Sequence, residues 1–224
     1  YDIEPNPDID DLDTIKKKFI DKNYKAMIAL GGGSVLDSAK ILAASLNSEN
    51  SLSDLFRKKI KNYSKRTIKL IVIPTTSGTG SEVTPFATLW DKRKGKKYSM
   101  EGESMYPDYL IMEPKFTLSL PREHTLYPAL DTISHSLESI WNKNSTNTSR
   151  DYAYQALGIL KTALPIVLSN PGNLKARTSM QEASYLAGKA ISQNKTAIAH
   201  SISYPLTSRF SVPHGLACSF TLVS

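Results

Sequence analysis

The 224-residue sequence contains a single cysteine, Cys218. One thiol excludes an intramolecular disulfide, and without a second cysteine a zinc-finger-type cluster is excluded as well. No run of about 18 apolar residues occurs, and the first residues, YDIEPNPDIDD, are acidic rather than a charged-then-apolar leader. We therefore expect a cytoplasmic protein with neither a membrane span nor a signal peptide.

The net charge of +7 would permit a nucleic-acid partner. Basic residues gather in RKKIKNYSKRTIK (57–69) and DKRKGKK (91–97). Both stretches have the composition of turn-like connectors, and neither contains a recognisable nucleic-acid recognition helix. This distribution predicts solvated loops and argues against a nucleic-acid partner.

Hydrophobic periodicity changes character along the chain. Helical spacing at 9–19 and 35–46 alternates with short apolar strands at 24–30, 69–74 and 108–114, and with a hairpin at 86–100 that turns around Lys94 and Gly95. Beyond residue 119, three apolar stripes at 126–140, 152–164 and 176–191 all have the helical period. The pattern predicts an α/β plus all-α protein, in which a parallel-sheet domain (1–118) precedes a helical domain (119–224). The loops and side chains described next make the first a candidate nucleotide-binding domain and the second a candidate metal-binding domain.

Two glycine-containing loops follow predicted strands. In MIALGGGSVLDSAK (27–40) a strand leads through three glycines into a helix, where backbone amides can face a phosphate, although a tight turn that merely needs glycine is an alternative. In IPTTSGTGSEVT (73–84) two glycines are combined with many hydroxyl groups that suit phosphate and ribose oxygens. Loops at the carboxyl ends of neighbouring strands favour a nucleotide ligand.

Asp131 and His135 lie four residues apart in ALDTISHSLES and therefore project from one helix face. They could share a metal ion, or they could form a simple helix-surface hydrogen bond. His200 and His214 would complete a site for Fe(II) or Zn(II) if the fold brings them over that helix.

The sequence resembles the iron-dependent (type III) alcohol dehydrogenases. The motifs GGGSVLDSAK, PTTSGTGSE, PDYLIMEPKFTLSLP, ALDTISHSLES and PHGLA occur in the order that the family shows. The resemblance implies a two-domain dehydrogenase that binds NAD(P)H and a divalent metal, Fe(II) in the first place and Zn(II) as an alternative. Its members continue beyond both ends of this sequence, so we expect a truncated chain, and a homo-oligomer when full length.

Carried over position by position, the resemblance assigns three groups of residues. The metal ligands match Asp131, His135, His200 and His214. The residues for the cofactor match Gly32, Gly33, Ser34 and Asp37 in the first loop, Thr75, Thr76, Thr79 and Ser81 in the second, and Lys97 near the nicotinamide ribose. Tyr204 stands where many members carry a second histidine, so we predict proton donation through water for it or, alternatively, packing or substrate contact.

The stretch AGKAISQNKTAIAHSISYPLTSRFSVPHG is similar to one branch of the family, the phosphonoacetaldehyde reductases. Lys195, Thr196 and Arg209 would place two cations and a hydroxyl near the metal, which suits an anionic aldehyde, unless these side chains face solvent. The resemblance implies reduction of phosphonoacetaldehyde to 2-hydroxyethylphosphonate. The alternatives are a broad-range primary alcohol or diol dehydrogenase, and a metal- or nucleotide-binding fragment without turnover.

Overall fold

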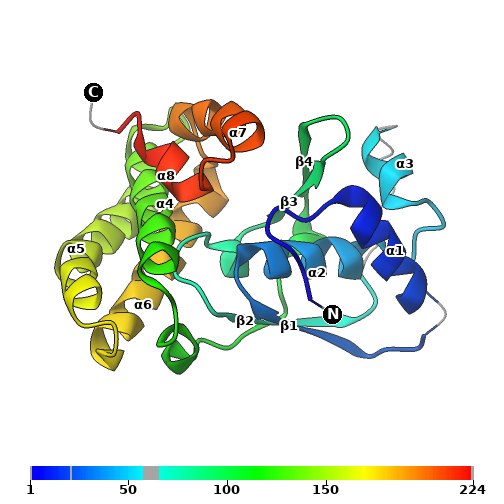
Figure 1. Ribbon diagram of the computed structural model, residues 1–224, viewed down its shortest axis with the longest axis horizontal. Helices are drawn as coiled ribbons and strands as arrows, with labels where there is room; N and C mark the ends of the chain where they lie inside the picture. The colour runs from blue at the N-terminus through cyan, green and yellow to red at the C-terminus, as the bar shows by residue number, and fades with distance from the viewer. Residues whose placement is uncertain (1, 21, 58–65, 223–224) are drawn as a thin grey trace. The chain divides into compact units, whose positions relative to one another are not determined.

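The computed structural model describes residues 2–20, 22–57 and 66–222. The chain divides into two compact units, of which the first comprises Tyr1–Ile73 and Pro85–Ile111 and the second Pro74–Thr84 and Met112–Ser224 (Figure 1). Most of the connector predicted at 57–69 lies outside the described residues. The segment 74–84 thus belongs with the helices of the second unit, whereas the functional division near residue 119 stays a prediction.

The first unit contains the strands and the first three helices. A sheet in the order β1-β2-β5 includes the parallel pair β2 and β5, and β3 and β4 form a separate antiparallel hairpin. This confirms the parallel sheet and the hairpin predicted from the sequence; Gly95, at a φ of 57°, lies in the turn. The elements are α1 (Ile9–Phe19), β1 (Ala26–Gly31), α2 (Gly33–Ser45), α3 (Leu52–Arg57), β2 (Lys69–Pro74), β3 (Phe86–Asp91), β4 (Lys96–Glu101), the 3-10 turn η2 (Glu103–Met105) and β5 (Tyr109–Leu110).

The strand predicted at 108–114 is much shorter in the structure. Strand β5 covers only Tyr109 and Leu110, and one further ladder bond joins Ile111 N to Val72 O at 2.9 Å. Pro114 then opens the 3-10 turn η3 (Pro114–Thr117). Proline has no N–H to donate to a ladder, and its fixed φ suits a helical first turn, so the strand ends before it.

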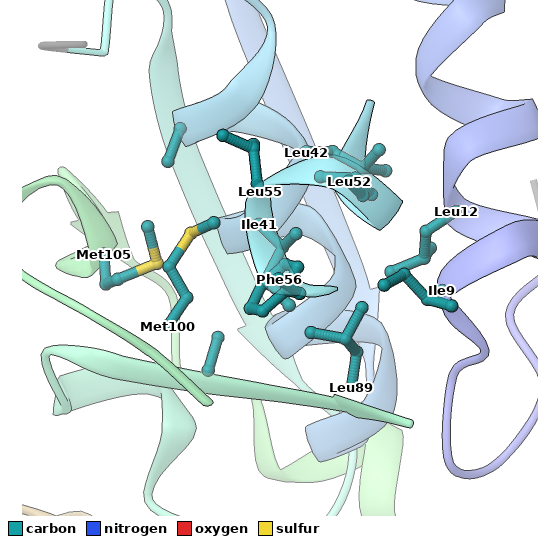
Figure 2. Packing of buried hydrophobic residues seen from close by; sticks show 12 residues of the cluster. Ile9, Leu12, Ile41, Leu42, Leu52, Leu55, Phe56, Leu89, Met100 and Met105 are labelled. Carbon is teal, nitrogen blue, oxygen red and sulfur yellow. The ribbon is translucent and has the colours of Figure 1, made fainter. Parts of the chain in front are cut away.

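The core of the first unit is built from large aliphatic side chains. Helices α1, α2 and α3 bring leucines and isoleucines against the β3–β4 hairpin (Figure 2). Figure 2 shows Ile41 of α2 among Leu55, Phe56 and Leu89, and all four are buried. Burial of this kind supplies most of the stability of such a unit.

The second unit consists of helices joined by short connections. They are α4 (Arg122–Trp141), α5 (Asn147–Ser169), α6 (Leu174–Asn194), α7 (Ile198–Phe210) and α8 (His214–Ser219), with the 3-10 turn η1 (Ser81–Val83) and η3. Helices α4, α5 and α6 run side by side (Figure 1) and pack through alanines with Leu160, Val167 and Met180. The three predicted stripes are thus confirmed as helices. None of the helices that the structure describes is long and apolar enough to cross a membrane.

The segment 74–84 packs closely on α4 and α6. Gly80 has a φ of 62°, and a Cβ placed there would lie 2.5 Å from Gly188 Cα on α6. Gln181 Nε2 on α6 donates to Pro74 O at 3.2 Å, and Thr132 Oγ1 on α4 donates to Gly78 O at 3.4 Å. Glycine at position 80 is therefore required both by the backbone conformation and by the close approach of α6.

Candidate metal centre

Helix α4 presents three titratable side chains along one face. Asp131, His135 and Glu138 follow one another at spacings of four and three residues, which places them on the same side of an α-helix. All three are buried, with exposed fractions of 4%, 4% and 0%. Ionisable groups are rarely buried without partners, so the surroundings of this face should provide them.

Helices α7 and α8 add two imidazoles to this face. The Oδ1 atom of Asp131 lies 3.6 Å from His135 Nε2, 3.3 Å from His200 Nε2 and 3.9 Å from His214 Nε2. The rings of His135 and His200 stack with their centroids 4.7 Å apart. The structure therefore brings together the four residues that the sequence singled out as metal ligands.

The arrangement fits a divalent metal. Asp131 Oδ1 and His200 Nε2 are buried and 3.3 Å apart, and apart from this ion-pair contact neither atom makes a hydrogen bond in the part of the chain that the structure describes. Buried polar atoms without partners are uncommon and can mark an ion site. Donors bound at about 2.0–2.2 Å to one ion stand roughly 3–3.5 Å apart, close to the spacings seen here. One carboxylate and three imidazoles suit Fe(II) or Zn(II).

One side of the cluster is open to solvent. The His214 side chain is 33% exposed, whereas those of His135 and His200 are 5% and 4% exposed. Metal sites that act on a substrate keep one coordination position accessible, while purely structural sites are closed. The exposure of His214 therefore matches a site that a small molecule can enter.

Burial and the facing charges move the pKa values in this cluster. Burial alone would raise the pKa of Asp131, but the imidazoles of His135, His200 and His214 outweigh it and hold the pKa below its usual range. Burial lowers the pKa of His135 to about 4, although Asp131 opposes this. At neutral pH Asp131 is thus a carboxylate and His135 a neutral imidazole, which are the protonation states that metal ligands need. At His200 burial is outweighed by the contacts with Asp131, Cys218 and Glu138, which raise its pKa, so a metal bound there displaces a proton from this imidazole.

Glu138 positions His200, and the sequence reasoning missed it. One oxygen of its buried carboxylate pairs with His200 Nδ1, and the other accepts hydrogen bonds from Ala199 N at 2.7 Å and His200 N at 3.3 Å. The pair with Nδ1 places the proton there and leaves Nε2 free to act as a ligand. The available signal was spacing, since Glu138 lies seven residues after Asp131 on the same face.

Tyr204 lies beside the cluster on α7. Its half-buried ring is nearly parallel to that of His214, with centroids 6.2 Å apart and an interplanar angle of 13°. The ring of Tyr204 therefore lies next to His214, the most exposed of the four ligand candidates. Its role in proton donation or in packing stays a prediction.

The three residues predicted to bind substrate lie at the carboxyl ends of two helices in the second unit, α6 and α7. Lys195 follows the last residue of α6 with a φ of 64°, and its side chain is exposed, while Thr196 is half-buried. Arg209 lies in the last turn of α7 and is exposed. Asn142 Nδ2 fixes the α6–α7 connection by donating to Asn194 O at 2.9 Å and Lys195 O at 3.3 Å.

In the first unit, four of the predicted cofactor residues lie at the start of α2, and the fifth, Lys97, lies on β4. Gly32 is the N-terminal cap of this helix, and Gly33 and Ser34 form its first turn. Asp37 instead binds the neighbouring strand, since its Oδ2 accepts from Thr88 N at 2.8 Å and Thr88 Oγ1 at 2.9 Å. The half-buried Lys97 lies on β4 opposite Trp90.

In the second unit, the remaining predicted cofactor residues lie in the segment 74–84. Thr75, Thr76 and Thr79 are half-buried, and Ser81 is buried at the start of η1. Thr79 Oγ1 accepts from Ser81 N at 3.3 Å. Binding of one dinucleotide by both sets of residues stays a prediction.

Two family sequence models match the chain. The one described as "Iron-containing alcohol dehydrogenase" matches residues 1–114, and the one described as "Fe-containing alcohol dehydrogenase family, C-terminal" matches residues 125–224. Together they include every residue discussed in the metal centre and in the two loops. The matches agree with the resemblance drawn from the motifs.

Individual relatives cover most of the chain. A phosphonoacetaldehyde reductase of Streptomyces viridochromogenes is 34% identical over 87% of the chain and 51% of the relative. A 1-propanol dehydrogenase of Citrobacter freundii is 34% identical over 99% of the chain and 56% of the relative. The solved sulfoacetaldehyde reductase from Bifidobacterium kashiwanohense, in complex with NAD+, has a TM-score of 0.93 at 33% identity and covers 99% of the chain.

The chain spans about half the length of these two curated relatives. Within that span the family models, the fold and the four converging metal-ligand candidates agree with one another. The chain belongs to the iron-containing alcohol dehydrogenase family.

Proposed function

We propose that the protein is a metal-dependent NAD(P)H oxidoreductase that reduces a small aldehyde, phosphonoacetaldehyde, to the primary alcohol 2-hydroxyethylphosphonate. The observation that carries the proposal is the convergence of three imidazoles on the buried Asp131 Oδ1. A relative described as a phosphonoacetaldehyde reductase and a solved relative complexed with NAD+ support the substrate and the cofactor.

Each residue of the centre has a task in this proposal. Asp131, His135, His200 and His214 hold the metal, Fe(II) or alternatively Zn(II). The bound groups supply hydride from the nicotinamide and polarisation of the carbonyl oxygen by the metal. Glu138 keeps the proton of His200 on Nδ1, and Tyr204 Oη donates a proton through water to the product oxygen.

Recognition of the phosphonate falls to Lys195, Thr196 and Arg209. Two cations and a hydroxyl offer charge-assisted hydrogen bonds to a dianion. Such bonds contribute about 1.5–3 kcal/mol each, which corresponds to roughly 10–100-fold in affinity. The effect should be absent for an uncharged aldehyde.

The test measures NADH and NADPH oxidation by the Fe(II)-loaded protein without oxygen, with phosphonoacetaldehyde and with propanal. Lys195→Ala should raise the KM for phosphonoacetaldehyde by about 10-fold or more and leave the KM for propanal unchanged. Alanine retains the Cβ, so the backbone strain at the positive φ of Lys195 is the same in both proteins. Lys175→Ala, an exposed lysine at the other end of α6, is the matched control.

A broad-range primary alcohol or diol dehydrogenase is the second candidate. The relative described as a 1-propanol dehydrogenase and the exposure of Lys195 and Arg209 favour it. Preference for propanal, or equal effects of Lys195→Ala on both aldehydes, would select this candidate. Binding of metal and nucleotide without turnover of either aldehyde would instead identify a binding fragment.

A further inference from the structure

The single cysteine lies beside the metal centre. Cys218 is fully buried on α8, four residues after His214 and therefore on the same helix face. Its Sγ is 3.8 Å from His214 Nδ1 and 3.7 Å from His214 Nε2. One donor atom from each of Asp131, His200, His214 and Cys218 can be chosen so that all four lie within 4.8 Å of one another.

We propose that Cys218 Sγ is an additional ligand of the metal, so that the centre combines a thiolate with a carboxylate and imidazoles. The proposal rests on the metal centre of the proposed function. A second observation points to the same place, because Asp131 Oδ1 and His200 Nε2 are buried and, apart from their 3.3 Å ion-pair contact with each other, have no hydrogen-bond partner in the described chain. A metal bound there has the sulfur within reach.

The surroundings of Cys218 differ from those of a cysteine that only fills space. A buried free thiol usually behaves as a small apolar side chain among other apolar side chains. Cys218 instead faces the ring nitrogens of His214, and His200 and Asp131 belong to the same group. An environment made of imidazole and carboxylate groups, which are common metal ligands, suits coordination of a metal by the thiol better than apolar packing of the thiol.

Coordination changes the thiol in a defined way. The Sγ–H bond breaks, the proton leaves to solvent, and the sulfur electron pair forms the bond to the divalent metal, whose oxidation state does not change. A thiolate is a softer donor than a carboxylate or an imidazole, and soft donors favour Zn(II). The ratio of Zn(II) affinity to Fe(II) affinity should therefore fall when the sulfur is removed.

Cobalt(II) substitution tests the proposal directly. The 224-residue chain, loaded with one Co(II) in buffer free of added thiols, should show a near-ultraviolet thiolate-to-cobalt charge-transfer band. Cys218 is the only cysteine of the 224 residues, so no other side chain of the chain can produce this band. The visible ligand-field bands of Co(II) report independently that the metal is bound.

Variants sharpen the assignment. Cys218→Ser, with Cys218→Ala as a second variant, should lose the charge-transfer band, keep the visible bands and weaken Co(II) binding by at least about 10-fold. Ser219→Ala, the next residue on α8, is the matched control and should keep the charge-transfer band.

The outcomes separate this proposal from the proposed function. A chain that binds one Co(II) and shows visible bands but no charge-transfer band overturns the role of Cys218 and leaves the metal centre intact. A chain that binds no Co(II) overturns both. Because the unsubstituted chain alone decides between these outcomes, a variant that fails to fold does not weaken the test.

Discussion

Helices α2 and α4 each bury nine residues, but these residues differ in their chemistry. The buried residues of α2 in the first unit include Leu36, Ile41 and Leu42. On α4 in the second unit, a helix that the structure describes in full, Ala129 is the only apolar member of the buried set, which otherwise consists of polar and titratable residues. The first unit thus uses most of the buried residues of α2 for apolar packing, whereas the second unit uses the buried residues of α4 to build a site.

The difference shows where each unit is vulnerable. Apolar burial contributes to the free energy of unfolding in proportion to the buried area. A smaller side chain at a buried apolar position of α2 therefore lowers the stability of the first unit. Buried polar atoms cost free energy unless each finds a partner, so α4 depends on its neighbours. Asn194 of α6 illustrates this dependence, since its Nδ2 donates to Ser139 O at 3.0 Å and to Ser149 Oγ at 3.2 Å.

The largest effect is expected from truncating the core of the first unit. Ile41→Ala should lower its free energy of unfolding by about 2–5 kcal/mol, because Ile41 is fully buried and the lost methyl groups leave a cavity. Urea unfolding can be followed by the fluorescence of Trp90 on β3, in a Trp141→Phe background that removes the other tryptophan. The Co(II) affinity should be unchanged, and a large loss of affinity would contradict the separation of roles.

The corresponding change in the second unit concerns the metal rather than the core. Glu138→Gln should weaken Co(II) binding by about 10–100-fold, because an amide holds the proton of His200 on Nδ1 less strongly than a carboxylate. The amide oxygen can still accept from Ala199 N, so the far-ultraviolet circular dichroism should change little. Glu123→Gln, on the exposed first turn of α4, is the control. Equal affinities for the two variants would refute a positioning role for Glu138.

A pair of glycines tests the close packing of the second unit. Gly188 and Gly158 both lie inside helices, but a Cβ at Gly188 would lie 2.7 Å from Val83 Cγ2 and 2.8 Å from Gly80 Cα, whereas nothing lies within 4 Å at Gly158. Gly188→Ala should destabilise by about 1–3 kcal/mol and Gly158→Ala should stabilise by about 0.5–1 kcal/mol. Unfolding midpoints measure both, and a stabilising Gly188→Ala would disprove the contact.

The smallest effect concerns acid titration of the first unit. The hydrogen bond from Arg57 Nε, 2.9 Å from Asp91 Oδ2, lowers the pKa of this buried carboxyl, although burial opposes the shift. With a folded pKa below the unfolded value of about 3.9, the contribution is present above roughly pH 4 and is lost as the pH falls through the folded pKa.

Asp91→Asn should therefore be less stable than the unsubstituted protein near pH 7, and this difference should shrink below about pH 4. Urea unfolding at a series of pH values measures it. Asp2→Asn, at an exposed position before α1, serves as the control. A difference between Asp91→Asn and the unsubstituted protein that stays constant down to pH 2 would exclude the ion pair as its source.

Periodicity predicted α1, α2, α4, α5, α6 and the β3–β4 hairpin, because these elements depend on local patterns of apolar residues, but it did not single out α3, α7 or α8. It did not predict the packing of the segment 74–84 on α6, because the approach of Gly80 to Gly188 joins residues far apart in the sequence. The length of strand β5 was overestimated, because the apolar run 108–114 does not show where hydrogen bonding to the neighbouring strand stops.

The four ligand candidates were predicted from a helical spacing and from family motifs, and the structure places them together. Glu138 and Cys218 were missed for different reasons. A buried glutamate cannot be distinguished from a surface glutamate by its own sequence context, and the single cysteine was considered only for cysteine clusters. Both lie at helical spacings from a predicted ligand, so spacing was the usable signal.

The first turn of α7 is capped by a side chain from another helix. The capping residue of α7, Ala197, has no side-chain group that could accept a hydrogen bond, and the amides of Ala199 and His200 donate to Glu138, 61 and 62 residues earlier in the chain. Contacts between residues so distant in sequence form only after a long loop has closed. Folding of the second unit therefore joins α4 to α7 in a non-local step, and the same step places His200 beside Asp131.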